Sequence, residues 1–355
     1  MISHRIDFNS ISIEEFCKET NSRLKNSTQG KYRDAIDAMR TIAWYVSIEK
    51  ITGLKRPHQL EKQLEPESFS ANEYGETVRR NKWRQYRAGR HTPSDQFISK
   101  ISCRLKPQAT NIFHHVLWRI LREENLAADN WLEWLKEIPK SISKIFIKEK
   151  AYKTLDTLIG EILSARNLGK LELHADINAL ALLTIALKHA IHTQKFKQAQ
   201  DLSRIACRIF LLSGFDIFCN MGIAQPLFDY YERTFLSKSI YEGCFISFPP
   251  VKYRYLIGRL LDAMHNLEDV NYHKLSKVDI NKYQKKILSA DYGFDYLYLF
   301  KPIEIPSSTT LILDDPKVKR YQAALGLWKW ADTAWLNPSS RNTIPDHVWD
   351  KFRLQ

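Results

Sequence analysis

The residues of this chain that are best suited to a chemical task lie in one basic segment, residues 79–105. It holds eight Lys or Arg residues against the single acid Asp95, so its formal charge is +7, more than half of the +13 of the whole chain. Clustered cationic side chains neutralise phosphates and release their counterions, which favours a polyanionic partner. Trp83 and Tyr86 stand three apart and share one helix face. The segment therefore predicts nucleic-acid binding. The alternative is a solvated basic helix that packs by Trp83 and Tyr86.

Signatures of catalysis are missing from the sequence. It has no phosphate-binding loop, no dinucleotide-binding glycine pattern, no zinc-protease or serine-hydrolase motif, and no Cys/His set with zinc spacing. We therefore assign no catalytic residue, no metal site and no cofactor. Asp314 and Asp315, followed by Lys317 and Lys319, are the nearest approach to a metal-dependent nuclease site. Such a site needs carboxylates on adjacent strands, so a nuclease is kept as an alternative only.

The stretch KWRQYRAGRHTPSDQFISKISCRL resembles the second half of the helix-turn-helix domain of phage-repressor-type (Cro-like) regulators. The similarity covers about residues 72–106 and leaves the remainder of the chain unassigned. In that family a buried residue and an aromatic or Leu on the recognition helix precede a Gly, a Pro-Ser pair and an apolar-striped helix. The matching residues here are Trp83, Tyr86, Gly89, Pro93, Ser94, Ile98, Ile101 and Leu105. The preceding helix of the motif has no clear counterpart in SANEYGETVRR.

The resemblance implies a role for each residue of the segment. The recognition helix begins near Arg79 and enters the DNA major groove with its first turns. The base-reading positions are Arg80, Asn81 and Gln85, side chains that suit guanine or adenine. The phosphate-contacting positions are Lys82, Arg84, Arg87 and Arg90. The core positions are Trp83, Tyr86, Ile98, Ile101 and Leu105. In the RNA-binding alternative, Trp83 and Tyr86 instead stack on bases.

Local patterns predict the elements that position these residues. Apolar residues at spacings of three and four predict a helix over residues 30–50, which Gly53 and Pro57 end. The basic segment is expected to form a short helix, a turn at Gly89 with positive φ, and a second helix capped by Ser94.

The remainder of the chain is expected to be helical with one exception. Residues 175–215 predict a helical hairpin with its turn near Lys195 and Phe196. Residues 294–315 alternate apolar and polar types and predict a two-stranded β-hairpin around Pro306–Ser308. The fold class is therefore mainly α, with a helix-turn-helix-like N-terminal module, a helical bundle or hairpin region and one small β-hairpin near the C-terminus. The expected regions are 1–138 (containing 72–106), 140–240 and an aromatic-rich α+β region, 241–355.

Cysteine usage and hydropathy bear on the compartment. The five cysteines are widely spaced without a CxxC pair, which favours reduced thiols over a disulfide framework. The N-terminus lacks an apolar signal core, and no apolar run approaches the length of a membrane span. We expect a cytoplasmic protein without membrane contact.

The function expected from these observations is sequence-specific or semi-specific binding of double-stranded DNA. The chain is then a bacterial or phage-type regulator, or a mobile-element or defence-associated protein, in which residues 140–240 hold a homodimer or a protein partner. Two alternatives stay open: a helical scaffold or adaptor for a protein partner, and an RNA-binding protein or nuclease.

Overall fold

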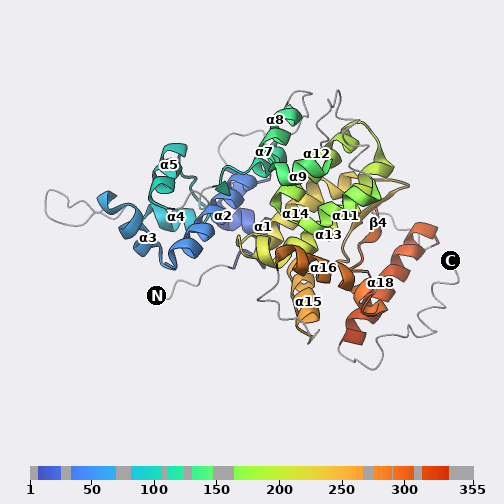
Figure 1. Ribbon diagram of the computed structural model, residues 1–355. Coiled ribbons are helices and arrows are strands. Elements are labelled where there is room, and N and C mark those ends of the chain that lie inside the picture. The colour runs from blue at the N-terminus through green and yellow to red at the C-terminus, as the bar shows by residue number, and fades with distance from the viewer. Residues whose placement is uncertain are drawn as a thin grey trace. The chain divides into compact units, whose positions relative to one another are not determined.

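The computed structural model is mainly α-helical, which confirms the expected fold class (Figure 1). It describes residues 7–24, 33–68, 81–105, 111–123, 130–146, 164–266, 276–289, 291–307 and 314–335. The chain forms two compact units. Unit 1 comprises Met1–Glu124 and Asp216–Asp229, and unit 2 comprises Asn125–Phe215 and Tyr230–Gln355. The division into three regions and the helix-turn-helix identity of the first module stay predictions.

Unit 1 is built from short helices around one long helix, α2. Ser12 and Glu15 form a capping box that starts α1. The side chain of Asp34 accepts a hydrogen bond of 2.9 Å from the Ile36 amide and so starts α2. Gly53, with φ of 71°, ends α2 as the sequence predicted. The described elements are α1 (Ile13–Thr20), β1 (Ser22–Arg23), β2 (Arg33–Asp34), α2 (Ala35–Thr52), α3 (Pro57–Leu64), the 3-10 helix η1 (Pro66–Ser68), α4 (Lys82–Arg87), α5 (Asp95–Arg104) and α7 (Val116–Arg122). The two residues of β1 pair in parallel with those of β2.

Aromatic rings make up the core of unit 1 beside α2. The buried indole of Trp44 stacks on Trp83 with 5.8 Å between ring centroids. It meets the edges of Tyr86 and Phe113 at 5.6 and 6.1 Å. Offset and edge-on ring contacts of this kind add about 0.5–1.5 kcal/mol per pair to the burial of the rings. We call these rings, together with Phe97, the Trp44 cluster; it joins α2, α4 and α5 into one body.

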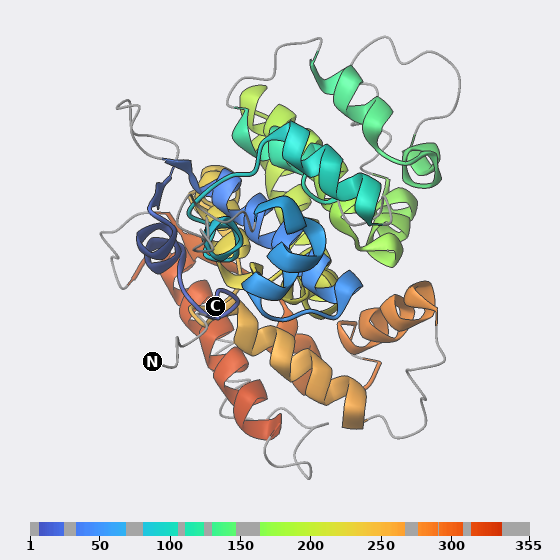
Figure 2. The ribbon, with the colours of Figure 1, turned by 90° about the vertical axis from the view of Figure 1, so that its left-hand side faces the viewer.

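Unit 2 is a larger assembly of helices with one small sheet. The chain leaves it within a π-helical turn, η2 (Gly214–Cys219), and re-enters it within α14 (Ala224–Thr234). Its longest described helix is α18 (Pro316–Trp335), drawn in red in Figures 1 and 2. The remaining elements are α8 (Asn130–Glu137), α9 (Lys140–Phe146), α11 (Ala165–His174), α12 (Ile177–His192), α13 (Phe196–Ser213), η3 (Leu236–Lys238), β3 (Cys244–Ser247), α15 (Tyr253–Asn266), α16 (Lys277–Ile287), α17 (Phe294–Phe300) and β4 (Ile303–Pro306).

The helical hairpin predicted over residues 175–215 is present as α12 and α13. Asp176 caps α12 by accepting a hydrogen bond of 2.8 Å from the Ala179 amide. The turn lies at Gln194, whose φ of 58° reverses the chain, and at Lys195, whose amide donates to the Ala190 carbonyl. Ala199 and Ala206 are fully buried on α13, where small side chains allow helices to approach closely. Local periodicity was sufficient to locate this hairpin.

A small antiparallel sheet occurs near the C-terminus, but its strands differ from the predicted pair. Residues 294–300 form helix α17 and not a strand, because Tyr296, Leu299 and Phe300 bury one helical face. Strand β4 pairs with β3, about sixty residues earlier, with Cys244 opposite Pro306 and Ser247 opposite Ile303. The second strand of the predicted hairpin, up to residue 315, falls mostly on residues 308–313, which lie outside the described residues. Mixed aromatic and apolar runs of this length do not distinguish helix from strand.

None of the helices that the structure describes is both long and apolar enough to cross a membrane. All five cysteines are free thiols, and Cys207 and Cys244 are buried. Burial raises the pKa of the Cys207 thiol, so it acts as a small apolar side chain in the core.

The turn between α4 and α5 provides a stability test. Gly89 has φ of 64°, and a Cβ there lies 2.8 Å from Ile42 Cδ1 and 3.0 Å from Thr20 Cγ2. Gly53 has a similar φ of 71° but no atom within 4 Å of such a Cβ. We predict that Gly53→Ala costs only the left-handed penalty, about 1–2 kcal/mol, and that Gly89→Ala costs about 1–3 kcal/mol more through overpacking. Urea unfolding of both variants measures the difference; equal losses contradict the packing argument.

Candidate nucleic-acid interface

Helix α4 is shorter than the recognition helix that the sequence predicted. Asn81 immediately precedes it with φ of 51° and ψ of 16°, in the left-handed region. A residue in that conformation cannot continue a right-handed helix, so the predicted start near Arg79 is wrong and the helix begins at Lys82. Arg79 and Arg80 lie outside the described residues. Asn is one of the few side chains that tolerate this backbone.

The two faces of α4 have opposite characters. Trp83 and Tyr86 are buried in the Trp44 cluster, and burial, with a smaller contribution from Glu65, raises the pKa of Tyr86 to about 12. Arg84 and Gln85 are exposed, and Arg87 is half-buried. The rings are covered and therefore not available to stack on bases, so the stacking role that the RNA-binding alternative gave them does not fit the structure.

The predicted core positions on α5 lie against the same cluster. Ile98 and Ile101 are buried, and Leu105 packs against the cluster as a partly buried side chain. Ser94 caps the helix by accepting a hydrogen bond of 3.2 Å from the Phe97 amide. The five residues assigned to the core therefore share one apolar environment.

The half-buried guanidinium of Arg33 holds the turn between α4 and α5 against α2. Arg33 donates to the Gly89 carbonyl and, over 2.5 Å, to the Thr92 hydroxyl. It also donates to the Asp37 carbonyl at 3.1 Å and to the Thr41 hydroxyl at 3.2 Å. Burial lowers the pKa of Arg33 to about 10. The fork geometry of arginine allows this single side chain to bridge two segments.

Acidic side chains from elsewhere in unit 1 neutralise part of the basic segment. Lys82 Nζ lies 3.0 Å from a carboxylate oxygen of the buried Glu65, which also accepts a hydrogen bond of 3.4 Å from the Trp83 indole. Arg90 donates over 2.9 Å to the backbone carbonyl of Glu19 and pairs with its carboxylate at 3.8 Å. Two of the predicted phosphate contacts, Lys82 and Arg90, thus have internal partners.

Glu67 binds two further cations of the segment. It pairs with Lys100 and, at 3.4 Å, with Arg104. Arg104 also donates to the Leu64 carbonyl, which ties α5 to the end of α3. The hydrogen bond from Lys100, with a smaller contribution from Arg104, lowers the pKa of Glu67 to about 2. No sequence spacing connects Glu19, Glu65 or Glu67 to their partners, so sequence reasoning missed all three.

Two cations of the segment have no acidic partner among the residues that the structure describes. These are Arg84 and Arg87, one turn apart on the outer face of α4. Gln85 and Asn81 are exposed beside them. Asn81, Arg84, Gln85 and Arg87, which we call the α4 face, form a compact group of amide and guanidinium donors. Such donors match phosphate oxygens and base edges.

The acids that the sequence suggested for a nuclease site make local contacts at the start of α18. Asp315 accepts a hydrogen bond of 2.8 Å from the Lys317 amide at the start of α18. The carboxylate of Asp314 is almost fully exposed and pairs with Lys319 at 3.3 Å. Neither acid lies on a described strand, so the arrangement that a two-strand metal site requires is not formed.

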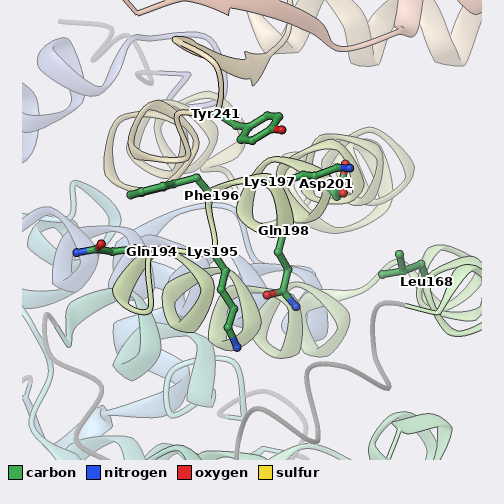
Figure 3. A pocket seen from close by; sticks show the side chains of 8 residues that line it. All are labelled: Leu168, Gln194, Lys195, Phe196, Lys197, Gln198, Asp201 and Tyr241. Atoms are coloured by element: carbon green, nitrogen blue, oxygen red, sulfur yellow. The ribbon is translucent and has the colours of Figure 1, made fainter.

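A shallow groove of about 730 Å³ lies in the region predicted to bind a protein partner. It borders the turn between α12 and α13 and includes the exposed ring of Phe196 and the side chains of Lys195 and Tyr241. Figure 3 shows that its labelled side chains extend in different directions instead of meeting at one point. The groove therefore does not select a ligand.

No family model, curated protein or solved structure matches this chain. Its function has to be inferred from the arrangement of its own residues.

The pKa of Glu67 predicts how stability changes with pH. Because the folded pKa is about 2 and the ordinary value is near 4, the Glu67 pairs stabilise the fold above about pH 5 and are lost as the pH falls toward 2. We expect the melting temperature to be lower in Glu67→Gln than in the native chain at pH 7. The gap should narrow at pH 3 and in 0.5 M salt, because the pairs are exposed. A gap of the same size at pH 3 and pH 7 contradicts this assignment.

Proposed function

We propose that unit 1 binds double-stranded DNA through the α4 face. The observation that carries the proposal is the pair of the exposed Arg84 and the half-buried Arg87, which have no acidic partner in the described part of the chain, on a helix whose inner face is fixed in the Trp44 cluster. A fixed backbone reduces the conformational entropy that ordering a binding surface costs. The similarity to repressor-type helix-turn-helix modules supports the same assignment.

Within this proposal the residues have different tasks. Arg84 and Arg87 bind phosphates or guanine through two hydrogen bonds, and Gln85 suits adenine. Arg90 becomes a phosphate ligand by exchanging its exposed partner Glu19, because exposed ion pairs contribute only about 0–1 kcal/mol. Lys82 is less free to do so, since the carboxylate of its partner Glu65 is buried. Asn81 and Arg80 remain proposed base-reading residues.

The length of α4 favours binding by more than one copy. Six helical residues span about 9 Å, less than the width of the major groove, which is about 12 Å. One such helix contacts few base pairs, so we expect two copies to occupy adjacent half-sites about one helical turn apart. A homodimer or protein partner held by residues 140–240, a regulatory or defence-associated role and a cytoplasmic location belong to the same proposal.

The salt dependence of duplex binding tests the α4 face. We predict that Arg84→Ala with Arg87→Ala weakens binding to a random 20-base-pair duplex about tenfold or more. The log–log slope against salt should fall by about 2, the loss of two phosphate contacts. Fluorescence anisotropy at 50 and 200 mM salt measures both quantities, with single-stranded DNA and RNA of the same sequence as comparisons.

The matched control is Lys100→Ala with Arg104→Ala, which removes the same charge from cations already paired with Glu67. It should change affinity less than threefold. Equal losses in the two double variants attribute binding to net charge alone and exclude the α4 face. Failure of the native chain to bind duplex DNA overturns the proposal.

A further inference from the structure

Unit 2 contains a second cavity, of about 390 Å³, between β4 and α18. Ile246 on β3, Ile303 on β4 and Leu327 on α18 are buried and form its apolar wall. Tyr298 of α17 and the side chain of Arg204 on α13 also border it. Its volume falls within the range of small-molecule sites. Five elements thus meet around one partly enclosed space.

The charged residues of this cavity are unequally matched. Arg204 is held by Glu304 at 2.8 Å and by Asp201 at 2.9 Å. Lys301 and Arg320, both exposed at the cavity, have no carboxylate partner among the described residues. The Lys301 ammonium lies 5.8 Å from the centroid of the Tyr298 ring. Two cations next to an apolar wall are therefore left for an anion from outside the chain.

Apolar and cationic groups line the same space. An apolar wall gains from covering hydrocarbon or an aromatic ring, whereas guanidinium and ammonium groups gain from a phosphate or carboxylate. A purely apolar ligand leaves Lys301 and Arg320 without an anion, and a bare anion leaves the half-buried Pro302 and Ala324 of the lining in contact with water. A molecule that carries both an apolar body and an anionic group interacts with the apolar and the cationic side chains at once.

We propose that this cavity binds a small molecule with one flat apolar body and one phosphate, carboxylate or sulfonate group. The anionic group lies between Lys301 and Arg320, and the body lies against Pro302, Ala324 and the apolar wall behind them. The site is separate from the α4 face and does not depend on DNA binding by unit 1.

Binding of the dye 8-anilinonaphthalene-1-sulfonate tests the proposal, because it combines two rings with one anionic group. We predict that the native full-length chain binds it and that Arg320→Gln with Lys301→Gln weakens binding about tenfold, as expected for lost charge-assisted hydrogen bonds. The control Lys319→Gln removes one charge from the neighbouring position on α18, where the side chain pairs with Asp314. It should change affinity less than twofold.

Two further measurements identify the site and the source of the anion. Ala324→Phe places a ring in the cavity, so it should abolish dye binding while the melting temperature shows that the chain stays folded. Displacement of the dye by AMP indicates a phosphate ligand, and displacement by phenylacetate indicates a carboxylate ligand. Adenosine, which has no anionic group, should not displace it.

Three outcomes overturn the proposal. A loss in Lys319→Gln as large as that in the double variant Arg320→Gln with Lys301→Gln attributes dye binding to general electrostatics. Unchanged binding in folded Ala324→Phe places the dye elsewhere. Displacement by adenosine as effective as that by AMP removes the role of the anion.

Discussion

The arrangement of unit 1 depends on the burial of Trp44 among the rings of α4, α5 and Phe113. An isolated helix of six residues is not stable in water, because nucleation costs more than so few hydrogen bonds return. Helix α4 therefore exists through its packing: Trp83 stacks on Trp44, and Tyr86 meets its edge. Arg84 and Gln85 are exposed because of the same packing, since the buried rings of Trp83 and Tyr86 occupy the opposite face of the helix.

Hydrogen bonds from the Arg33 guanidinium fix the turn after α4, which the packing of the rings does not constrain. Burial of the Arg33 guanidinium is unfavourable unless its donors find acceptors, and the turn at Gly89 and Thr92 supplies two of them. The backbone of Gly89 can approach α2 only because the residue has no Cβ to meet Ile42. The packing of Trp44 against the rings of α4 sets the distance between α2 and α4. The hydrogen bonds of Arg33 set the path of the chain after α4.

The sequence was informative where structure is local. Gly53, Gly89 and Ser94 end or start helices as predicted, because caps and left-handed turns depend on residues within one helical turn. It was uninformative where distant segments meet. Periodicity identifies a buried face but not the face that covers it, so the pairing of β4 with β3 and the ion pair between Glu65 and Lys82 had no detectable signal.

Formal charge overstates how much of a basic protein is able to bind anions. Lys82, Lys100 and Arg104 count toward the charge of the basic segment, yet each has a glutamate of the same unit beside it. A carboxylate that is already in place must be displaced before a phosphate can bind, whereas Arg84 and Arg87 present no such competitor among the described residues. The same reasoning selects Lys301 and Arg320 over Arg204 in unit 2. Binding capacity therefore follows the cations that the fold leaves without acids.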